Sequence, residues 1–330
     1  MIDQNNARRR TAARTLTCAA LLSLSTVSGA QEFPLRPIKL LLPYAPGGSS
    51  DLASRLAAQY MGPVLGQSVL VENKPGGGGV PAIAELMRAA PDGHTIFGAE
   101  AGQWAILPAA RADLPYNFLR DFAPIGLVYT AQQAIVVRDS VPARNLQELI
   151  ALARAKPGSL QYGSPQIGGL HHLIMESFKA ALGLNMGHVP YKGSGDSVQA
   201  LLRGDVPIIM SGITAVAPYM KTGQVRLLAV ASQTRALQAP EVPTIIEAAG
   251  LTGFHFAGQL GLVAPIATPR PVIDKLSAAL RKGALHPDAV ARAAVTGVDM
   301  TPSTPEVLAE VIREDIRKYT AAVKVSGLVP

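Results

Sequence analysis

Cysteine is almost missing from this sequence of 330 residues, in which Cys18 is the only one. Cys18 falls in an N-terminal segment with the features of a secretion signal, so we expect export to remove it. A chain without cysteine forms no disulfide and offers no thiolate to a metal ion or a substrate. The sequence therefore excludes a disulfide framework, a thiolate metal site and a cysteine nucleophile in the exported chain.

Charged residues are also scarce, at 16% of the chain against roughly 25% in an average globular protein. Hydrophobic residues make up 48%, which is enough for a large core and excludes a disordered chain. Beyond the N-terminal segment, no apolar run approaches the roughly 20 residues of a membrane-spanning helix. The aromatic residues do not alternate with a lysine or arginine stripe, so we expect no nucleic-acid partner. These absences predict a soluble protein with a large core.

Residues 1–30 have the composition of a signal peptide. Arginines occupy positions 8, 9 and 10, a weakly apolar stretch covers residues 16–27, and Ser28 and Ala30 have the spacing that signal peptidase accepts. We expect cleavage before Gln31, with a basic tail that stays attached as the alternative. Without these residues the formal charge falls from +7 to +4, because 26 basic and 22 acidic residues remain. Part of the positive charge thus indicates export rather than a polyanionic partner.

Strand-like apolar runs alternate with helical patterns along most of the chain, which is typical of parallel sheets covered by helices. Since no long linker interrupts the chain, we expect two α/β lobes joined by strands that cross near residues 129–134 and 231–234. The first lobe comprises residues 31–130 and 233–330, and the second comprises residues 131–232. An amphipathic helix over residues 307–323 is expected to pack on the first lobe. Strands are expected at residues 38–42, 68–72, 95–99, 134–137, 161–163, 186–189, 206–210, 226–231 and 260–264.

Residues 43–51, with the sequence PYAPGGSSD, connect the first expected strand to a helix. Glycine permits a ligand to approach the backbone closely, and the amides at a helix start carry partial positive charge. Ser49 and Ser50 add hydroxyl donors, whereas Asp51 fits best as a helix cap. The loop therefore predicts an anion site, with a tight capped turn that holds no ligand as the alternative.

Three further glycine-rich loops each precede a helix. Residues 75–81 match a relaxed dinucleotide-binding pattern, but a structural turn that lines the same cleft is the preferred interpretation. Residues 162–169 and 189–196 repeat the arrangement in the middle of the chain. If these two loops belong to the second lobe, helix starts from both lobes face one cleft and could hold a small anion between them.

Metal and hydrolase chemistry have little support in the sequence. His172 and Glu176 are four residues apart on a helical pattern and His171 adjoins them, but no third ligand has suitable spacing. Ser164 lacks the small-residue pattern of a nucleophile elbow. We therefore predict no metal site, and the residues give no argument for hydrolysis.

A series of short motifs runs from the N-terminal part of the exported chain almost to its end. They lie at residues 33–38 (FPLRPI), 43–48 (PYAPGG), 71–76 (VENKPG), 91–95 (PDGHT), 114–117 (LPYN), 121–125 (DFAPI), 188–193 (HVPYKG), 240–244 (PEVPT) and 262–265 (LVAP), with Asp51 after the second. In order and spacing they resemble the solute receptors of tripartite tricarboxylate transporters, often called Bug proteins. The resemblance covers essentially all of the exported chain.

The resemblance implies a two-lobed periplasmic-binding-protein fold of type II-like topology, with hinge strands that let the lobes close on a ligand. It implies a periplasmic monomer, without catalysis or cofactor, that binds a small carboxylate and delivers it to the membrane permease of a tripartite transporter. A dicarboxylate and an aromatic acid are both open as ligands, and a membrane sensor is the alternative partner. By matching position, the resemblance implies ligand contacts at Tyr44, Ala45, Gly47, Gly48, Ser49, Ser50, Asp51, Gly78, Ala99, Glu100, Gln103, Ser164, Gly168, Tyr191 and Ser211.

Three positions depart from the family pattern. Glu100 lies in a segment where relatives carry threonine or serine. Pointing into the cleft it repels a second carboxylate or favours an amine or amide, and pointing outward it is a solvated acid. Ser211 lies near a position where many relatives have an acid, which weakens an amino-acid ligand. Gln259 replaces a frequent tryptophan, which leaves a more polar or roomier cleft. An exported enzyme that uses Asp51, Glu100 or His172 as an acid or base is the alternative function.

Overall fold

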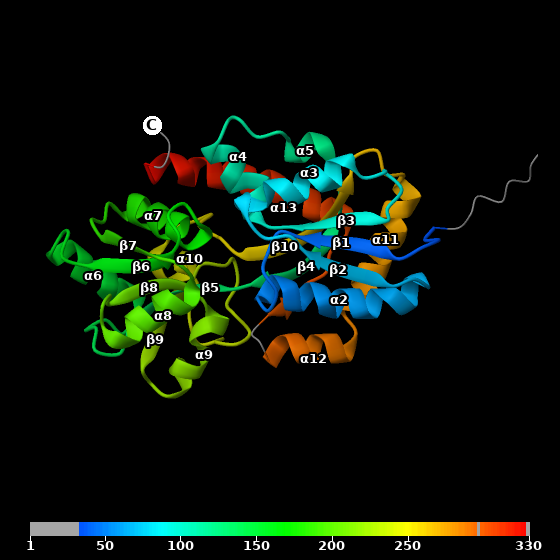
Figure 1. The fold of residues 1–330 in the computed structure, drawn as a ribbon. Helices are drawn as coiled ribbons and strands as arrows, with labels where there is room; N and C mark the ends of the chain where they lie inside the picture. Colours follow the sequence, from blue (N-terminus) through cyan, green and yellow to red (C-terminus); the bar gives the residue numbers. More distant parts are fainter. Residues whose placement is uncertain (1–32, 296–297, 328–330) are drawn as a thin grey trace, which may run out of the picture. The chain divides into compact units, whose positions relative to one another are not determined.

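The structure is a computed structural model that describes residues 33–295 and 298–327. The predicted signal peptide at residues 1–30 lies outside the described residues. Contacts divide the chain into Met1–Leu35 and Arg36–Pro330, and the second unit contains both sheets (Figure 1). Within the described part of the chain, every helix is too short or too polar to cross a membrane.

Six strands form the first sheet, in the order β11-β4-β10-β3-β1-β2. β1 is parallel to β2 and β3, whereas β10 is antiparallel to β3 and β4. β1 buries four of its five residues, since α3 and α2 lie on opposite sides of this part of the sheet (Figure 1). The strands are β1 (Ile38–Leu42), β2 (Val69–Asn73), β3 (Thr95–Ala99), β4 (Phe122–Ala131), β10 (Gly258–Pro265) and β11 (Asp299–Met300).

The helices around the first sheet come from both ends of the chain. They are α2 (Ser49–Leu65), α3 (Val80–Arg88), α4 (Leu107–Ala110), α5 (Phe118–Asp121), α11 (Arg270–Ala284), α12 (Pro287–Val295) and α13 (Pro305–Val325). α13 buries Leu308, Ile312 and Tyr319, which are spaced by four and seven residues and so share one face. α13 contacts β4 of the first sheet, on which the amphipathic pattern predicted it to pack, and it also contacts α7 beside the second sheet.

Five strands form the second sheet, in the order β7-β6-β8-β5-β9. β6 is parallel to β7 and β8, and β5 is antiparallel to β8 and β9. The strands are β5 (Gln133–Arg138), β6 (Gln161–Pro165), β7 (Gly187–Tyr191), β8 (Ile208–Gly212) and β9 (Val225–Val230). Their helices are α6 (Leu146–Ala155), α7 (Leu170–Leu182), α8 (Ser194–Arg203), α9 (Ile213–Lys221) and α10 (Ile245–Ala249).

The chain leaves the first sheet between β4 and β5. It returns to that sheet much later than residue 233, where the sequence predicted the first lobe to resume. After β9, Val230 forms an isolated parallel bridge with Thr244. Ala236 and Val242 are buried in one apolar cluster with residues of the second sheet and its helices. Because these side chains pack there, the chain rejoins the first sheet only at Gly258, where β10 begins.

Candidate functional site

The loop between β1 and α2 is held by the side chain of Asp51, which is almost completely buried. Its carboxylate accepts hydrogen bonds from the Gly47 amide (3.0 Å), from Asn73 Nδ2 (2.9 Å) and from Arg55 Nε (3.0 Å). Burial raises the pKa of Asp51, but the hydrogen bonds from Arg55, Gly47 and Asn73 outweigh it and keep the pKa below its ordinary value. Asp51 therefore acts as an ionised brace for the loop.

The start of α2 leaves backbone amides available. Its first helical bond runs from the Leu52 amide to the Gly48 carbonyl (2.9 Å), and no side chain caps the helix at Gly48. The amides of Ser49 and Ser50 donate to no backbone carbonyl within residues 33–295 and 298–327. Ala45, Gly48 and Ser49 are exposed and Ser50 is partly so. These amides carry partial positive charge, so this accessible helix start is suited to an anion.

A carboxylate lies beside this helix start. Glu100 follows β3, and its Oε1 accepts hydrogen bonds from Ser50 Oγ (2.5 Å) and from Tyr129 Oη (3.0 Å). Burial raises the pKa of Glu100 above its ordinary value, although the bonds from Ser50 and Tyr129 oppose this effect. Glu100 thus points toward α2 and β4 and is not a solvated surface acid.

Gln103 links three loops of the first sheet. It lies in a π-helical segment, Gly102–Ile106, and its Oε1 accepts from Tyr44 Oη (2.7 Å) and from the Glu100 amide (3.0 Å). Its Nε2 donates to the Gly78 carbonyl (3.2 Å), and its own carbonyl accepts from Tyr116 Oη (2.9 Å). Gln103 therefore fixes Tyr44 and the segment that carries Glu100. Ala99 was also expected at the site, but its methyl group is fully buried in the apolar core.

The site residues expected from the middle of the chain form a second group. Ser164 is fully buried at the end of β6, and its Oγ lies 2.8 Å from His188 Nε2. The Gly168 amide donates to His172 Nδ1 (3.0 Å), and the rings of His172 and His188 stack with centroids 4.0 Å apart. Histidine pairing thus connects Ser164 to the loop before α7.

Tyr191 adjoins the Ser164 group, because its carbonyl accepts a hydrogen bond from the Gln166 amide (2.9 Å), and Ser211 lies on the neighbouring strand β8. Ser211 is buried in β8 and donates to the Gly212 carbonyl at 3.3 Å. Tyr191 ends β7, and its ring covers the Cα of Gly163, where an added Cβ would lie 2.8 Å from the ring. Across the described residues, no hydrogen bond joins this half of the expected site to the half around Glu100. The structure therefore brings the expected residues together as two separate groups.

The sequence missed Tyr129 and His188 as site residues. Tyr129 reaches Ser50 and Glu100 because β4 belongs to the same sheet as β3, whereas the sequence predicted only a strand that crosses between lobes near residues 129–134. His188 lies in the motif at residues 188–193 and on β7. Its place in a motif at the end of an expected strand could have indicated a role in the site. Both are polar groups that a strand brings to the site from a distant part of the chain.

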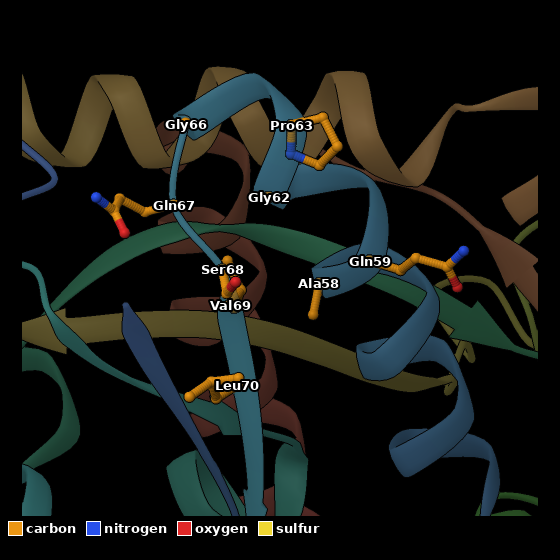
Figure 2. A pocket seen from close by; sticks show the side chains of 9 residues that line it. All are labelled: Ala58, Gln59, Gly62, Pro63, Gly66, Gln67, Ser68, Val69 and Leu70. Carbon is orange, nitrogen blue, oxygen red and sulfur yellow. The ribbon is translucent and has the colours of Figure 1, made fainter. Parts of the chain in front are cut away.

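A hollow of about 600 Å³ lies at the opposite end of α2 from Ser50. Figure 2 shows that Gln59 and Gln67 point away from each other at its edges. No titratable side chain lines it; the lining residues are Ala58, Gln59, Gly62, Pro63, Gly66, Gln67, Ser68, Val69 and Leu70. It therefore lacks the convergent polar groups of the Glu100 cluster. In the described part of the chain, no three His, Cys, Asp or Glu side chains are placed to hold a metal ion.

The histidines of the second group give the first testable prediction. Burial lowers the pKa of both His171 and His188 to about 4. Since the unfolded pKa is about 6.5, the stability from neutral imidazoles is present above that pH and is lost as the pH falls toward 4. A shift of this size corresponds to about 3 kcal/mol for a fully buried group, and we expect about 1–2 kcal/mol for the partly accessible His188. Urea unfolding at neutral and mildly acidic pH measures the loss.

His188→Gln is the matched variant for this experiment, because an amide can still bond Ser164 but does not titrate. It should lose less stability than the unmodified protein between the two pH values. Equal losses in the two proteins would show that His188 has no part in the acid sensitivity.

Comparison with known proteins places this arrangement in a family. The model of the tripartite tricarboxylate transporter family receptor matches residues 53–328. The chain belongs to this receptor family. A UPF0065 protein of Pseudomonas sp. strain P51 is 33% identical over 317 residues, which cover 96% of this chain and 94% of the relative.

Solved structures of receptors agree with this assignment. The periplasmic binding protein BugD is 31% identical with a TM-score of 0.72 and covers 90% of this chain and 99% of its own. MatC from Rhodopseudomonas palustris with bound malate is 30% identical (TM-score 0.72; 88% and 100% covered). Rpa4515 of R. palustris with adipate is 27% identical (TM-score 0.75; 90% and 99% covered). The predicted two-lobed periplasmic-binding-protein fold and the Bug-type family are thus confirmed.

Proposed function

We propose that this receptor-family chain is exported to the periplasm, binds a small organic carboxylate and delivers it to the membrane permease of a tripartite transporter. Its family consists of periplasmic solute receptors, and two similar receptors have malate and adipate bound. In this proposal the protein acts as a monomer and returns its ligand chemically unchanged. The two lobes, joined by the crossings after β4 and before β10, close on the ligand by hinge motion.

The observation that carries the proposal is the accessible start of α2. The amides of Ser49 and Ser50 have no backbone partner in the described residues, and the hydroxyl of exposed Ser49 adds a further donor. A ligand carboxylate at this position receives charge-assisted hydrogen bonds and the favourable end of the helix dipole. Tyr44 and Gln103 hold the neighbouring loops in place, and the loops around Ser164, Gly168 and Tyr191 face the ligand from the second lobe.

A carboxylate ligand should raise the thermal stability of the purified exported chain. At about 100 times its dissociation constant, a ligand that binds only the folded state stabilises it by about 2.7 kcal/mol. Ser49→Glu should weaken binding at least tenfold, because the new carboxylate occupies the helix start, where an acid also favours the helix. A thermal-shift screen of organic acids that includes malate and adipate, followed by calorimetric titration, measures both effects.

Ser159→Glu is the matched control, because Ser159 is exposed in a loop of the second lobe and receives the same change of charge. It should leave affinity unchanged. Absence of any shift across the screen, or equal loss of affinity in both variants, would count against a carboxylate site at α2. Recovery of the ligand after long incubation tests whether it is returned unchanged.

A further inference from the structure

Glu100 has no positively charged partner. Within residues 33–295 and 298–327, no lysine, arginine or histidine forms an ion pair with it. The nearby acids differ in this respect, because Asp51 is paired with Arg55 (3.0 Å) and Asp315 with Lys318 (2.9 Å). A poorly solvated carboxylate without a counter-ion is costly to the fold. Of these three acids, Glu100 is therefore the one whose charge no cationic side chain among the described residues compensates.

The hydrogen bonds of Glu100 leave part of it available. Ser50 and Tyr129 donate to Oε1, and the hydroxyl of Tyr44 also interacts with the carboxyl group. Because a carboxylate has about four acceptor positions, Glu100 can still accept from one further donor. Although the residue as a whole is partly exposed, burial raises the pKa of its carboxyl group, so an ammonium group bonded to it would also be shielded from water. Neutral acceptors such as serine or glutamine would serve Ser50 and Tyr129 equally well. The bonds within the protein thus do not require a carboxylate at this position.

The distance between Glu100 and the start of α2 is short. Ser50 belongs to both features, since its amide is one of the available donors of the helix and its Oγ lies 2.5 Å from Glu100 Oε1. A ligand that places a carboxylate on these amides brings its next functional group close to Glu100. A second carboxylate there would face like charge, whereas an ammonium group would neutralise Glu100.

We infer that Glu100 determines specificity and that the ligand is a zwitterion, a small carboxylate that also carries a protonated amine. This inference rests on the proposed function and names the ligand class of the same site. The carboxylate of the ligand lies at the amides of Ser49 and Ser50, and its ammonium group donates to Glu100 Oε2. Burial raises the pKa of Glu100 in the ligand-free protein, and the bound ammonium group removes that penalty.

Matched ligands test the inference. β-Alanine and succinate differ mainly in an ammonium group that replaces one carboxylate, and the homologous ω-amino acids and dicarboxylates extend the series. Benzoate with a 4-carboxylate or a 4-aminomethyl group covers aromatic acids. In calorimetric titrations, the unmodified protein should bind the ammonium member of the best pair at least tenfold more tightly. Glu100→Gln should lose at least tenfold of that affinity and should bind the dicarboxylate better.

Glu85→Gln is the control, because Glu85 is an acid of the first lobe that pairs with Lys39 and Lys74 away from this site. It should keep the affinity and preference of the unmodified protein, and urea unfolding shows that both variants are folded. A preference for dicarboxylates, or unchanged ammonium affinity in Glu100→Gln, overturns the inference while the carboxylate receptor stands. No binding across the whole series overturns the proposed function itself.

Discussion

Gly283→Ala should lower the free energy of unfolding by about 1–3 kcal/mol or more, although alanine is the better helix former by about 1 kcal/mol. Gly283 lies in α11 where it crosses α2. A Cβ at this position would lie 2.8 Å from Met61 N, 2.9 Å from Tyr60 C and 3.2 Å from Ala57 O, all backbone atoms of α2. Backbone atoms cannot rotate away, so the two helices must separate. Urea unfolding followed by circular dichroism measures the change.

Gly195→Ala in α8 is the matched control for Gly283→Ala. A Cβ added at Gly195 would meet open space, so nothing opposes the helix preference of alanine there. Its stability should stay the same or rise by up to about 1 kcal/mol. Because α2 begins at Ser49, a shifted α2 should also weaken ligand binding in Gly283→Ala. Equal stability in the two variants would show that α2 and α11 tolerate separation.

Much of the fold could be predicted because the central strands are locally distinctive. β1 and β3 have the predicted bounds, Ile38–Leu42 and Thr95–Ala99, since an unbroken apolar run between turn residues favours a buried strand. β4 could not be predicted, because Pro124 and Gly126 interrupt its apolar pattern. The sheet accepts them through register shifts against β10 and through a close approach of Gly126 to the Ser303 carbonyl. These contacts join residues that are far apart in the sequence, so the local pattern around β4 cannot reveal them.

The candidate site was predictable to the same extent. The glycine loop before α2 and the neighbouring Glu100 could be read from local sequence, because a strand, a turn and a helix start follow one another. The direction in which the Glu100 side chain points could not be predicted, because it depends on a hydrogen bond from Tyr129 of β4. Likewise Ser164 was expected to contact ligand, and only the pairing of β6 with β7 reveals that His188 bonds its hydroxyl. Pairing between strands far apart in sequence decides which polar groups a ligand can reach.

Trp104→Ala should lower the free energy of unfolding by about 3–5 kcal/mol. Trp104 is fully buried in the π-helical segment Gly102–Ile106, and its Nε1 donates to Asp315 Oδ2 in α13 (2.9 Å). The substitution leaves a cavity and removes a partner from a carboxylate that is itself almost fully buried. Because Gln103 is the preceding residue, the same change should loosen Tyr44 and the Glu100 amide and weaken the ligand.

The two causes of this loss can be separated with Trp104→Phe and Asp315→Asn. Phenylalanine keeps most of the ring but has no N–H, so it should cost about 1–3 kcal/mol through the unpaired acceptor. Asparagine keeps an acceptor for Trp104 but gives up the ion pair with Lys318. If the indole bond couples the two positions, the double variant should lose less stability than the two single losses added together. Additive losses would show that Trp104 acts through its volume alone, and that α13 supports the Glu100 segment by packing without the hydrogen bond.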